Sequence, residues 1–411
     1  MNTDAVTKKP SFLENWKSSG PAWMAAGLNI GGATVTNSVL MAAATGFVLG
    51  WIFAIATFAI YLTTFVCVEL TMVTGKNPIR LIREEINPLA GWAVGLAILL
   101  VNLVFHTIQV VLGGLVLNTL FPVSQTFWGF GIVILTALFA LIPSKGSTVV
   151  VQQMLKWMVY ILSGSFLLTI FYVDIDWIGF FKGIFFFSIP TTKQSVLLFT
   201  AVLGSALAIN VPAIQAFATK SSGWGKERLP LFRFETLLTN CFLLFVQLCV
   251  LIVVASTLFK AGMQPKNAIQ AALALAPLAG KFSTILFCVG LFGAIFSTMV
   301  AQTGVAAYTL SDTLGWDPEP GSKRFKLIQG GLLAIAFSVP LFGWNPFSYV
   351  AWGAAFNATF MPIGIAAWWY LINSKKVVGE YKASTIFNAG LVIVFLIALV
   401  AAIRFWYITL S

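Results

Sequence analysis

The stretch "NIGGATVTN", residues 29–37, lies inside an apolar segment long enough to cross a membrane as one helix. Its adjacent glycines form helix poorly, since Gly costs about 1 kcal/mol relative to Ala in a helix interior. A break within hydrocarbon also leaves backbone groups unpaired, and it is tolerated only where it lines a cavity or a site. We therefore expect the first membrane helix to be interrupted at residues 31–34 for a functional reason.

The composition places most of the chain in a lipid bilayer. Of its 411 residues, 59% are hydrophobic and 9% are charged, and the mean hydropathy is +0.93. These values exclude a soluble globular protein. The net charge of +11 is better explained by loop residues that set membrane orientation than by nucleic-acid binding. The sequence has no nucleophile–base pair, phosphate loop or metal cluster, so we expect neither an enzyme nor a cofactor.

The apolar windows predict an all-α protein with eleven membrane spans. A short N-terminal tail, residues 1–19, precedes a single transmembrane domain, residues 20–411. The expected spans are 20–46, 48–73, 90–120, 127–143, 148–173, 194–219, 232–259, 283–309, 327–344, 347–372 and 385–408. Spans 1–5 thus occupy residues 20–173 and spans 6–10 residues 194–372.

Lysine and arginine alternate between rich and poor loops along the chain. Since basic loops stay in the cytoplasm, this asymmetry predicts a cytoplasmic N-terminus and an external C-terminus, as an odd number of spans requires. We expect a prokaryotic cytoplasmic membrane. Lys156, near the cytoplasmic start of span five, is expected to extend toward the interface.

The sixth span carries a second interruption, "AINVPAIQ" at residues 208–215. Pro212 lacks a backbone N–H and suits the first turn of a new half-helix. Spans one and six occupy matching positions if spans 1–5 and 6–10 form two halves. Interruptions at matching positions are typical of the central site of a transporter.

Several motifs in this order resemble the Nramp family of divalent-metal transporters. They are "GPAW" (20–23), "VTGKNPIRLIREE" (73–85), "GGLVLNTLF" (113–121), "LFCVGLFGAIFSTMVAQTGVAAYTLSDTL" (286–314) and "SKKVVGEYK" (374–382). The resemblance covers almost the whole chain. It implies a LeuT-type (APC superfamily) fold with a 5+5 inverted repeat and broken helices 1 and 6.

The metal-binding residues of that family do not carry over. Where the family has Asp-Pro-Gly-Asn in helix one, this chain has Gly31, Gly32, Ala33 and Thr34. The family has Met-Pro-His-Asn in helix six, and an ungapped alignment matches this motif to residues 208–211. An alternative alignment matches Pro212 to the proline of the family. Neither alignment places a methionine in the motif. The acidic pair of helix three corresponds to His106 and Gln109.

The missing carboxylate and thioether disfavour a metal cation, since divalent ions prefer hard oxygen ligands and transition metals gain from sulfur. Glycines instead let backbone N–H groups approach a ligand, at the positive end of a half-helix. We therefore expect a small anion such as bicarbonate, or a polar solute. The candidate substrate-binding residues are Gly31, Gly32, Ala33, Thr34, Asn37, Ala208, Asn210 and Gln215, and no metal site is expected.

His106 is the single histidine and lies in the middle of a span, where ionisable residues are functional candidates. With Gln109 one turn further on, it is the candidate for a coupling path carrying H⁺ or Na⁺. Asn357 and Gln302 are expected to bridge helices. Two alternatives stay open: a transporter of hydrated Mg²⁺ or Mn²⁺ held by uncharged oxygens, and a membrane receptor or sensor that does not transport.

Overall fold

The computed structural model describes residues 11–141, 147–265, 268–343 and 346–410. Over these residues the secondary structure is helical throughout, as predicted. The N-terminal tail is described from residue 11 and contains the short helix α1, Phe12–Ser18, while residues 1–10 lie outside the described part. Ser11 begins α1 with a capping box, because its hydroxyl accepts from the Glu14 N–H and the Glu14 carboxylate accepts from the Ser11 N–H.

The first half of the chain contains five spans and one amphipathic connecting helix. The first span is divided into α2 (Pro21–Asn29) and α3 (Gly32–Thr45). It is followed by α4 (Trp51–Thr74), the connecting helix α5 (Pro78–Glu85), α6 (Pro88–Leu120), α7 (Gln125–Leu141) and α8 (Ser147–Ile170). Gly75 ends α4 with a φ of +67°, a left-handed conformation that favours glycine.

The second half begins after the short helix α9, Trp177–Phe185. The sixth span is divided into α10 (Lys193–Ala206) and α11 (Asn210–Ser221). Beyond it lie α12 (Leu229–Val254) with the π-turn Ala255–Phe259, α13 (Ala268–Thr313), α14 (Lys323–Ser338), α15 (Pro346–Asn357), α16 (Met361–Asn373), the short α17 (Lys375–Val378) and α18 (Thr385–Leu410).

The prediction of eleven spans is confirmed within the described residues. Nine segments there are long and apolar enough to cross a membrane, and α7 is a shorter apolar helix. The α2–α3 pair supplies the eleventh span, which each half is too short to make alone. The predicted span 347–372 is present, and it contains a break that was not predicted, at residues 358–360 between α15 and α16.

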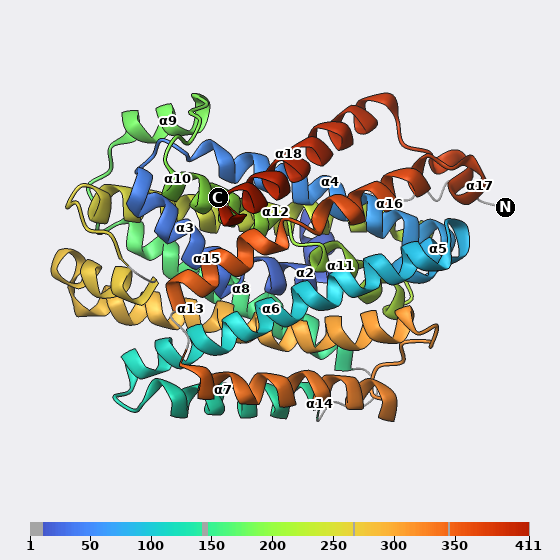
Figure 1. Ribbon diagram of the computed structural model, residues 1–411, viewed down its shortest axis with the longest axis horizontal. Helices are drawn as coiled ribbons and strands as arrows, with labels where there is room; N and C mark the ends of the chain where they lie inside the picture. The colour runs from blue at the N-terminus through green and yellow to red at the C-terminus, as the bar shows by residue number, and fades with distance from the viewer. Residues whose placement is uncertain (1–10, 142–146, 266–267, 344–345, 411) are drawn as a thin grey trace.

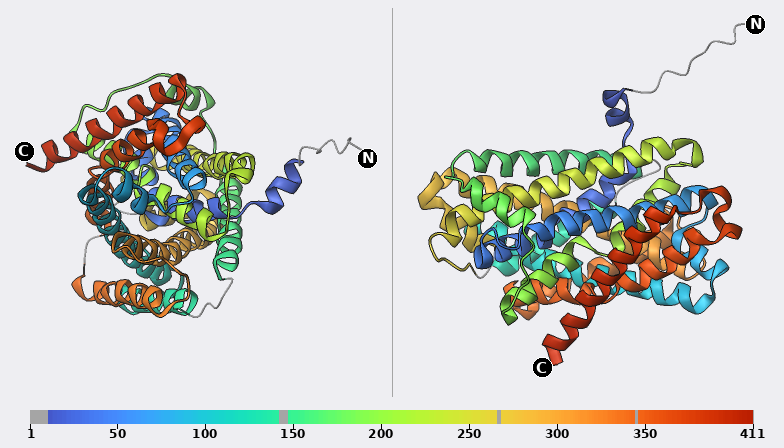
Figure 2. Two further views of the ribbon diagram at one scale, coloured as in Figure 1. Left: turned by 90° about the vertical axis from the view of Figure 1, so that its right-hand side faces the viewer. Right: turned by 90° about the horizontal axis from the view of Figure 1, so that it is seen from above.

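The broken helices lie in the interior of the bundle. Helices α6 and α13 pack along each other beside them, and α7 and α14 lie together on the outside (Figures 1 and 2). Helices α5 and α17 lie at one end of the molecule, and α9 lies at the other (Figure 1). Side chains of α2, α3, α10 and α11 are almost all buried, whereas α18 presents exposed apolar residues to its surroundings. A membrane supplies the apolar surroundings that such a surface needs.

Ion pairs and hydrogen bonds to carboxylates fix α5 at its end of the molecule. Asp312, at the end of α13, accepts hydrogen bonds from the Ile79 and Arg80 backbone N–H groups at 3.0 Å each, at the start of α5. Lys76 pairs with Glu84 and Glu85, and its hydrogen bonds hold the pKa of both carboxyls below the usual range. A carboxylate at a helix N-terminus is favourable because it meets unpaired N–H groups.

Candidate functional site

The first interruption consists of Ile30 and Gly31, slightly shorter than predicted. The Ile30 N–H still donates to the Ala26 carbonyl, and α3 starts at Gly32, so Ala33 and Thr34 lie in its first turn. Gly31 has extended backbone angles that any residue adopts, so its requirement is close approach. A Cβ at Gly31 would overlap the hydroxyl of Thr298 in α13 and lie 3.0 Å from the Leu28 carbonyl oxygen.

Thr298 holds this interruption from the neighbouring helix. Its hydroxyl lies 2.8 Å from the carbonyl oxygen of Gly27, near the end of α2, and 2.7 Å from the Ala294 carbonyl oxygen of its own helix. Ser297 makes a longer contact of 3.3 Å to the same Gly27 oxygen. The carbonyl that the break leaves without a helical partner is therefore satisfied by α13.

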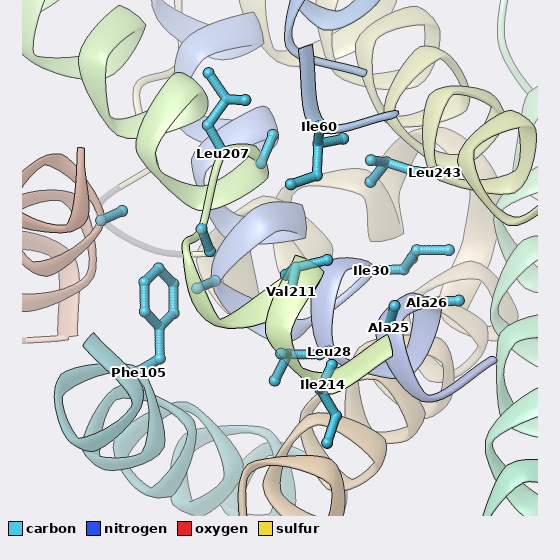
Figure 3. Close-up of a cluster of buried hydrophobic side chains, with 14 of the residues drawn as sticks. Ala25, Ala26, Leu28, Ile30, Ile60, Phe105, Leu207, Val211, Ile214 and Leu243 are labelled. Carbon is cyan, nitrogen blue, oxygen red and sulfur yellow. The ribbon is translucent and has the colours of Figure 1, made fainter. Parts of the chain in front are cut away.

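The second interruption lies between α10 and α11. Figure 3 shows Leu207 and Val211 on either side of it, with Phe105 of α6 pointing toward it. Helix α11 resumes at Asn210, so Pro212 lies in its first turn, as predicted. The Val211 N–H donates to the Ala208 carbonyl at 3.0 Å. The break is shorter than the predicted 208–215, which leaves Gln215 within regular helix.

The third interruption, at residues 358–360, is joined directly to the second. The side-chain amide of Asn357 donates to the carbonyl oxygen of Gly204 in the last turn of α10. A Cβ at Gly204 would overlap the Ala354 carbonyl of α15, so the two helices are in close contact. The predicted helix-bridging role of Asn357 is therefore present, and it connects two interrupted helices.

Amide oxygens without a hydrogen-bond partner are concentrated near the three interruptions. Each belongs to a side chain no more than 4% exposed and finds no donor among the described residues. They are the side-chain oxygens of Asn29, Asn37, Gln109, Asn210 and Asn357, and a sixth belongs to Asn102 beside Gln302. Gln109 reaches the first break, because a Cβ at Gly32 would lie 2.6 Å from its Oε1. A buried polar atom without a partner is costly, so these oxygens are candidates for a ligand or for water.

Asn29 also lines a small cavity with room for about one water molecule. This cavity lies among α2, α4, α11 and α12, and Thr64, Gln215 and Asn240 are among its walls. Asn29 is a candidate site residue that the sequence interpretation omitted, although it directly precedes the glycine pair. It lies in the last turn of α2, where helix carbonyls also lack partners.

Two hydrogen-bond donors predicted to hold an anion are used within the protein. The Thr34 hydroxyl donates to the Ser205 carbonyl oxygen at 3.4 Å. The Gln215 amide donates to the Thr236 hydroxyl at 2.6 Å. Ala33 and Ala208 are buried and offer only backbone groups. Neither the amide nitrogen nor the oxygen of Asn37 has a hydrogen-bond partner in the described part of the chain.

His106 is fully buried and forms a network between α6 and α13. Its Nδ1 lies 3.0 Å from the Gln302 Oε1, and the Asn102 amide donates to the Gln302 carbonyl oxygen at 3.0 Å. Gln302 therefore bridges helices as predicted. The His106 Nε2 is buried and has no hydrogen-bond partner among the described residues. Gln109 follows three residues later on the same helix and is equally buried.

The buried carboxylates of the described residues form ion pairs and hydrogen bonds away from the helix interruptions. Within the described part of the chain, no three His, Cys, Asp or Glu residues form a group suited to a metal. Glu69 pairs with Arg233 at 3.2 Å, Glu235 accepts from the start of α2, and Asp312 accepts from the start of α5. The oxygen atoms that could bind a ligand at the interruptions therefore belong to uncharged amide groups.

Lys156 differs from its predicted place at the interface. Only 6% of it is exposed, and its Nζ donates to the Trp16 carbonyl at 2.7 Å and to the Ser19 hydroxyl at 3.3 Å. The ammonium also lies 5.4 Å from the centre of the Trp23 ring. The N-terminal segment folds over this lysine and buries it, a contact that no local sequence pattern indicates.

Comparison with known proteins identifies related chains. The family model described as Nramp, natural resistance-associated macrophage protein-like, matches residues 22–407. The divalent metal cation transporter MntH of Bacillus subtilis is 24% identical over 339 residues, 78% of this chain and 76% of that protein. The MntH of Erwinia tasmaniensis is 22% identical over 288 residues, 69% of each chain.

Solved structures share the fold. A manganese transporter of Eremococcus coleocola superposes with a TM-score of 0.75 at 16% identity, covering 97% of this chain and 87% of that one. MhsT in complex with L-phenylalanine gives a TM-score of 0.63 at 14% identity, covering 96% and 98%. The LeuT-type fold is thereby confirmed.

The prediction of a small anion or polar solute is wrong. The matched relatives are named divalent metal cation transporters, which overturns it. The physical reason for the error is that an amide carries an acceptor as well as donors. The prediction relied on donors, but the structure uses two of them internally. Among the described residues, the amide nitrogens of Asn37 and Gln109 have no partner, and more amide oxygens than nitrogens near the breaks are unpaired.

Proposed function

The chain belongs to the Nramp family of membrane transporters, and from this premise we propose that it carries divalent metal cations across a membrane. One observation supports the proposal from the site itself. Buried amide oxygens without partners occur at all three helix interruptions. Oxygen atoms of this kind are ligands for hard divalent cations.

The ligand set favours a cation that keeps part of its water. Removing a doubly charged ion from water is very costly, and amide oxygens carry no full negative charge with which to offset that cost. Mg²⁺ dehydrates reluctantly and usually keeps several waters, and Mn²⁺ also suits carbonyl and water ligands. The proposed site comprises the oxygens of Asn29, Asn37, Asn210 and Asn357 with the backbone at Gly31, and the cation is the transported substrate.

Purified protein in liposomes provides the test. We expect saturable uptake of Mn²⁺ or Mg²⁺ and no uptake of bicarbonate or nitrate. Because Asn210 begins α11 and holds an unpaired oxygen, Asn210→Leu is expected to lower cation affinity at least roughly tenfold. Gln329→Leu, which removes a buried amide in α14, is the matched control and is expected to keep normal uptake.

Two outcomes would contradict this function. Saturable anion uptake without cation uptake would show that the substrate is an anion and not a divalent cation. Cation binding with no flux of any solute would favour the receptor or sensor. Equal affinity in the Asn210→Leu and Gln329→Leu variants would leave the cation function standing but remove Asn210 from the site.

We further propose that His106 carries the coupled proton, with Gln109 on the same path. Support comes from the position of this ionisable residue in the middle of α6, its partner Gln302 on one nitrogen, and the second nitrogen, which has no partner among the described residues. In His106→Gln, uptake driven by a pH gradient is expected to fall to the level seen without the gradient, while uptake down a metal gradient persists. Asn102→Leu, which alters the same network without removing a titrating group, is the control. Unchanged pH-driven accumulation in His106→Gln, or accumulation driven by Na⁺ instead, would rule the proposal out.

We propose that residues 20–411 form one transmembrane domain in a prokaryotic cytoplasmic membrane, with the N-terminus in the cytoplasm and the C-terminus outside. The charge distribution supports this orientation, because the end of the molecule that carries α5 and α17 is rich in Lys and Arg. Lys182, Lys193 and Lys260 are among the few basic residues of the opposite end.

A further inference from the structure

We propose that a phospholipid with an anionic headgroup binds in a pocket between α9 and the turn that joins α3 to α4. The pocket has a volume of about 490 Å³, within the range of small-molecule sites. Its apolar walls include Phe47, Val48, Phe186 and Phe259, and Lys182 is the charged residue that lines it. Among the described residues, no carboxylate lines the pocket.

The outward face of α9 requires an apolar cover. Phe180 and Gly183 are buried against the protein, while a run of large apolar residues faces outward. The exposed residues are Trp177, Ile178, Phe181 and Phe185 of α9, followed by Phe186 and Phe187 directly after the helix. Leaving such a surface in water is unfavourable in proportion to its apolar area. A helix with this face lies at a membrane surface, where Trp and Phe contact the acyl chains.

The position of Trp51 beside the pocket indicates that the pocket lies at the level of the lipid headgroups. It begins the long apolar helix α4, and its indole N–H donates to the carbonyl oxygen of Ser188, a residue that lines the pocket, at 3.2 Å. Its ring centre lies 5.1 Å from that of Phe187. Tryptophan is enriched at this boundary because its ring is apolar and its N–H is polar. The pocket therefore opens where one lipid presents both a phosphate and an acyl chain.

The charge of Lys182 selects the headgroup. It lies in the last turn of α9 and is exposed, and it forms no salt bridge with any described residue. A lysine near a membrane surface attracts anionic lipid headgroups. The combination of a single cation with phenylalanine walls matches a phosphate above a hydrocarbon chain.

The same pocket contacts the outer end of a broken helix. A Cβ at Gly183 would overlap the Phe47 carbonyl oxygen, and the Phe47 and Phe180 rings meet edge to face at 5.9 Å. Gly46, with a φ of +59°, ends α3 and lies against the Phe259 ring. A lipid here rests on the turn after α3, so its presence stabilises that turn. Any effect on uptake rests on the proposed transport function, whereas lipid binding does not.

Native mass spectrometry of the detergent-purified full chain tests the binding. With phosphatidylglycerol and phosphatidylethanolamine supplied equally, we expect one retained phosphatidylglycerol per protein. Lys182→Glu reverses the charge, and we expect roughly 30-fold weaker retention. Val48→Trp fills the pocket and is expected to abolish retention without a change of charge. Lys193→Glu, at the same end but outside the pocket, is the matched control and is expected to retain the lipid.

Retention in both Lys182→Glu and Val48→Trp equal to that of the unaltered chain would overturn the proposal. Equal retention of the two lipids would overturn the anionic headgroup, and a stable dimer that buries α9 would assign the surface to a second copy. Lys182→Gln serves as a milder variant should the charge reversal prevent folding. Uptake is measured separately, so loss of transport with retained lipid contradicts only the proposed function.

Discussion

A Gly31→Ala variant is expected to lose at least about 90% of its cation uptake, because the added methyl group has no room at the first interruption. It would overlap the Thr298 hydroxyl and lie 3.0 Å from the Leu28 carbonyl oxygen. Thr298 cannot turn aside freely, since its hydroxyl is held between the Gly27 and Ala294 carbonyls. Overpacking of this kind typically costs about 1–3 kcal/mol and separates the packed elements. The initial rate of Mn²⁺ or Mg²⁺ uptake in liposomes measures the effect.

Gly330→Ala is the matched control for this prediction. Gly330 lies within α14, and a Cβ there would meet no atom within 4 Å. Uptake is expected to be unchanged, with stability raised by up to about 1 kcal/mol from the better helix former. A double variant, Gly31→Ala with Thr298→Ala, removes the overlapping hydroxyl and is expected to recover part of the uptake. Full activity in Gly31→Ala would show that close approach to α13 is not required.

Local residue chemistry made the first two interruptions predictable. The pair Gly31 and Gly32 marked one, and Pro212 marked the start of α11 in the other. The third had a comparable signal, because Pro362 lies in the first turn of α16, but the surrounding apolar run concealed it. Break lengths were overestimated, since a helix restarts after two or three residues once a neighbour such as Thr298 satisfies the free carbonyls.

The substrate class was beyond local reasoning, because an amide side chain is donor and acceptor together. Whether Gln215 or Thr34 offers a donor depends on Thr236 and Ser205, which are distant in sequence or lie on another helix. The burial of Lys156 likewise depends on the path of the N-terminal segment. Such tertiary contacts decide which polar atoms stay free, so the sequence predicted the helix interruptions better than the hydrogen-bonding state of the polar groups beside them.

Removal of the Glu235 carboxylate is expected to have the largest effect on stability. Glu235 is fully buried in α12 and accepts the Gly20 N–H at 2.8 Å and the Ala22 N–H at 3.0 Å. It thereby caps the start of α2, and it also offsets the charge of the nearby buried Lys156. Glu235→Leu leaves two donors without a partner and removes the carboxylate that acts on Lys156, which keeps only its neutral partners Trp16, Ser19 and Trp23, at an expected cost of about 3–5 kcal/mol.

Thermal unfolding in detergent measures this loss, with Glu227→Ala as the matched control. The Glu227 carboxylate is exposed and accepts the Gly225 N–H within the same short segment, with no bond to a distant element among the described residues, so no measurable change is expected. The Lys156 charge contributes much of the loss of stability in Glu235→Leu. The double variant Glu235→Leu, Lys156→Met is therefore expected to lose less free energy of unfolding than the two single variants lose together. Strict additivity would mean that the carboxylate acts only as a helix cap and that the lysine is held by Trp16 and Ser19 alone.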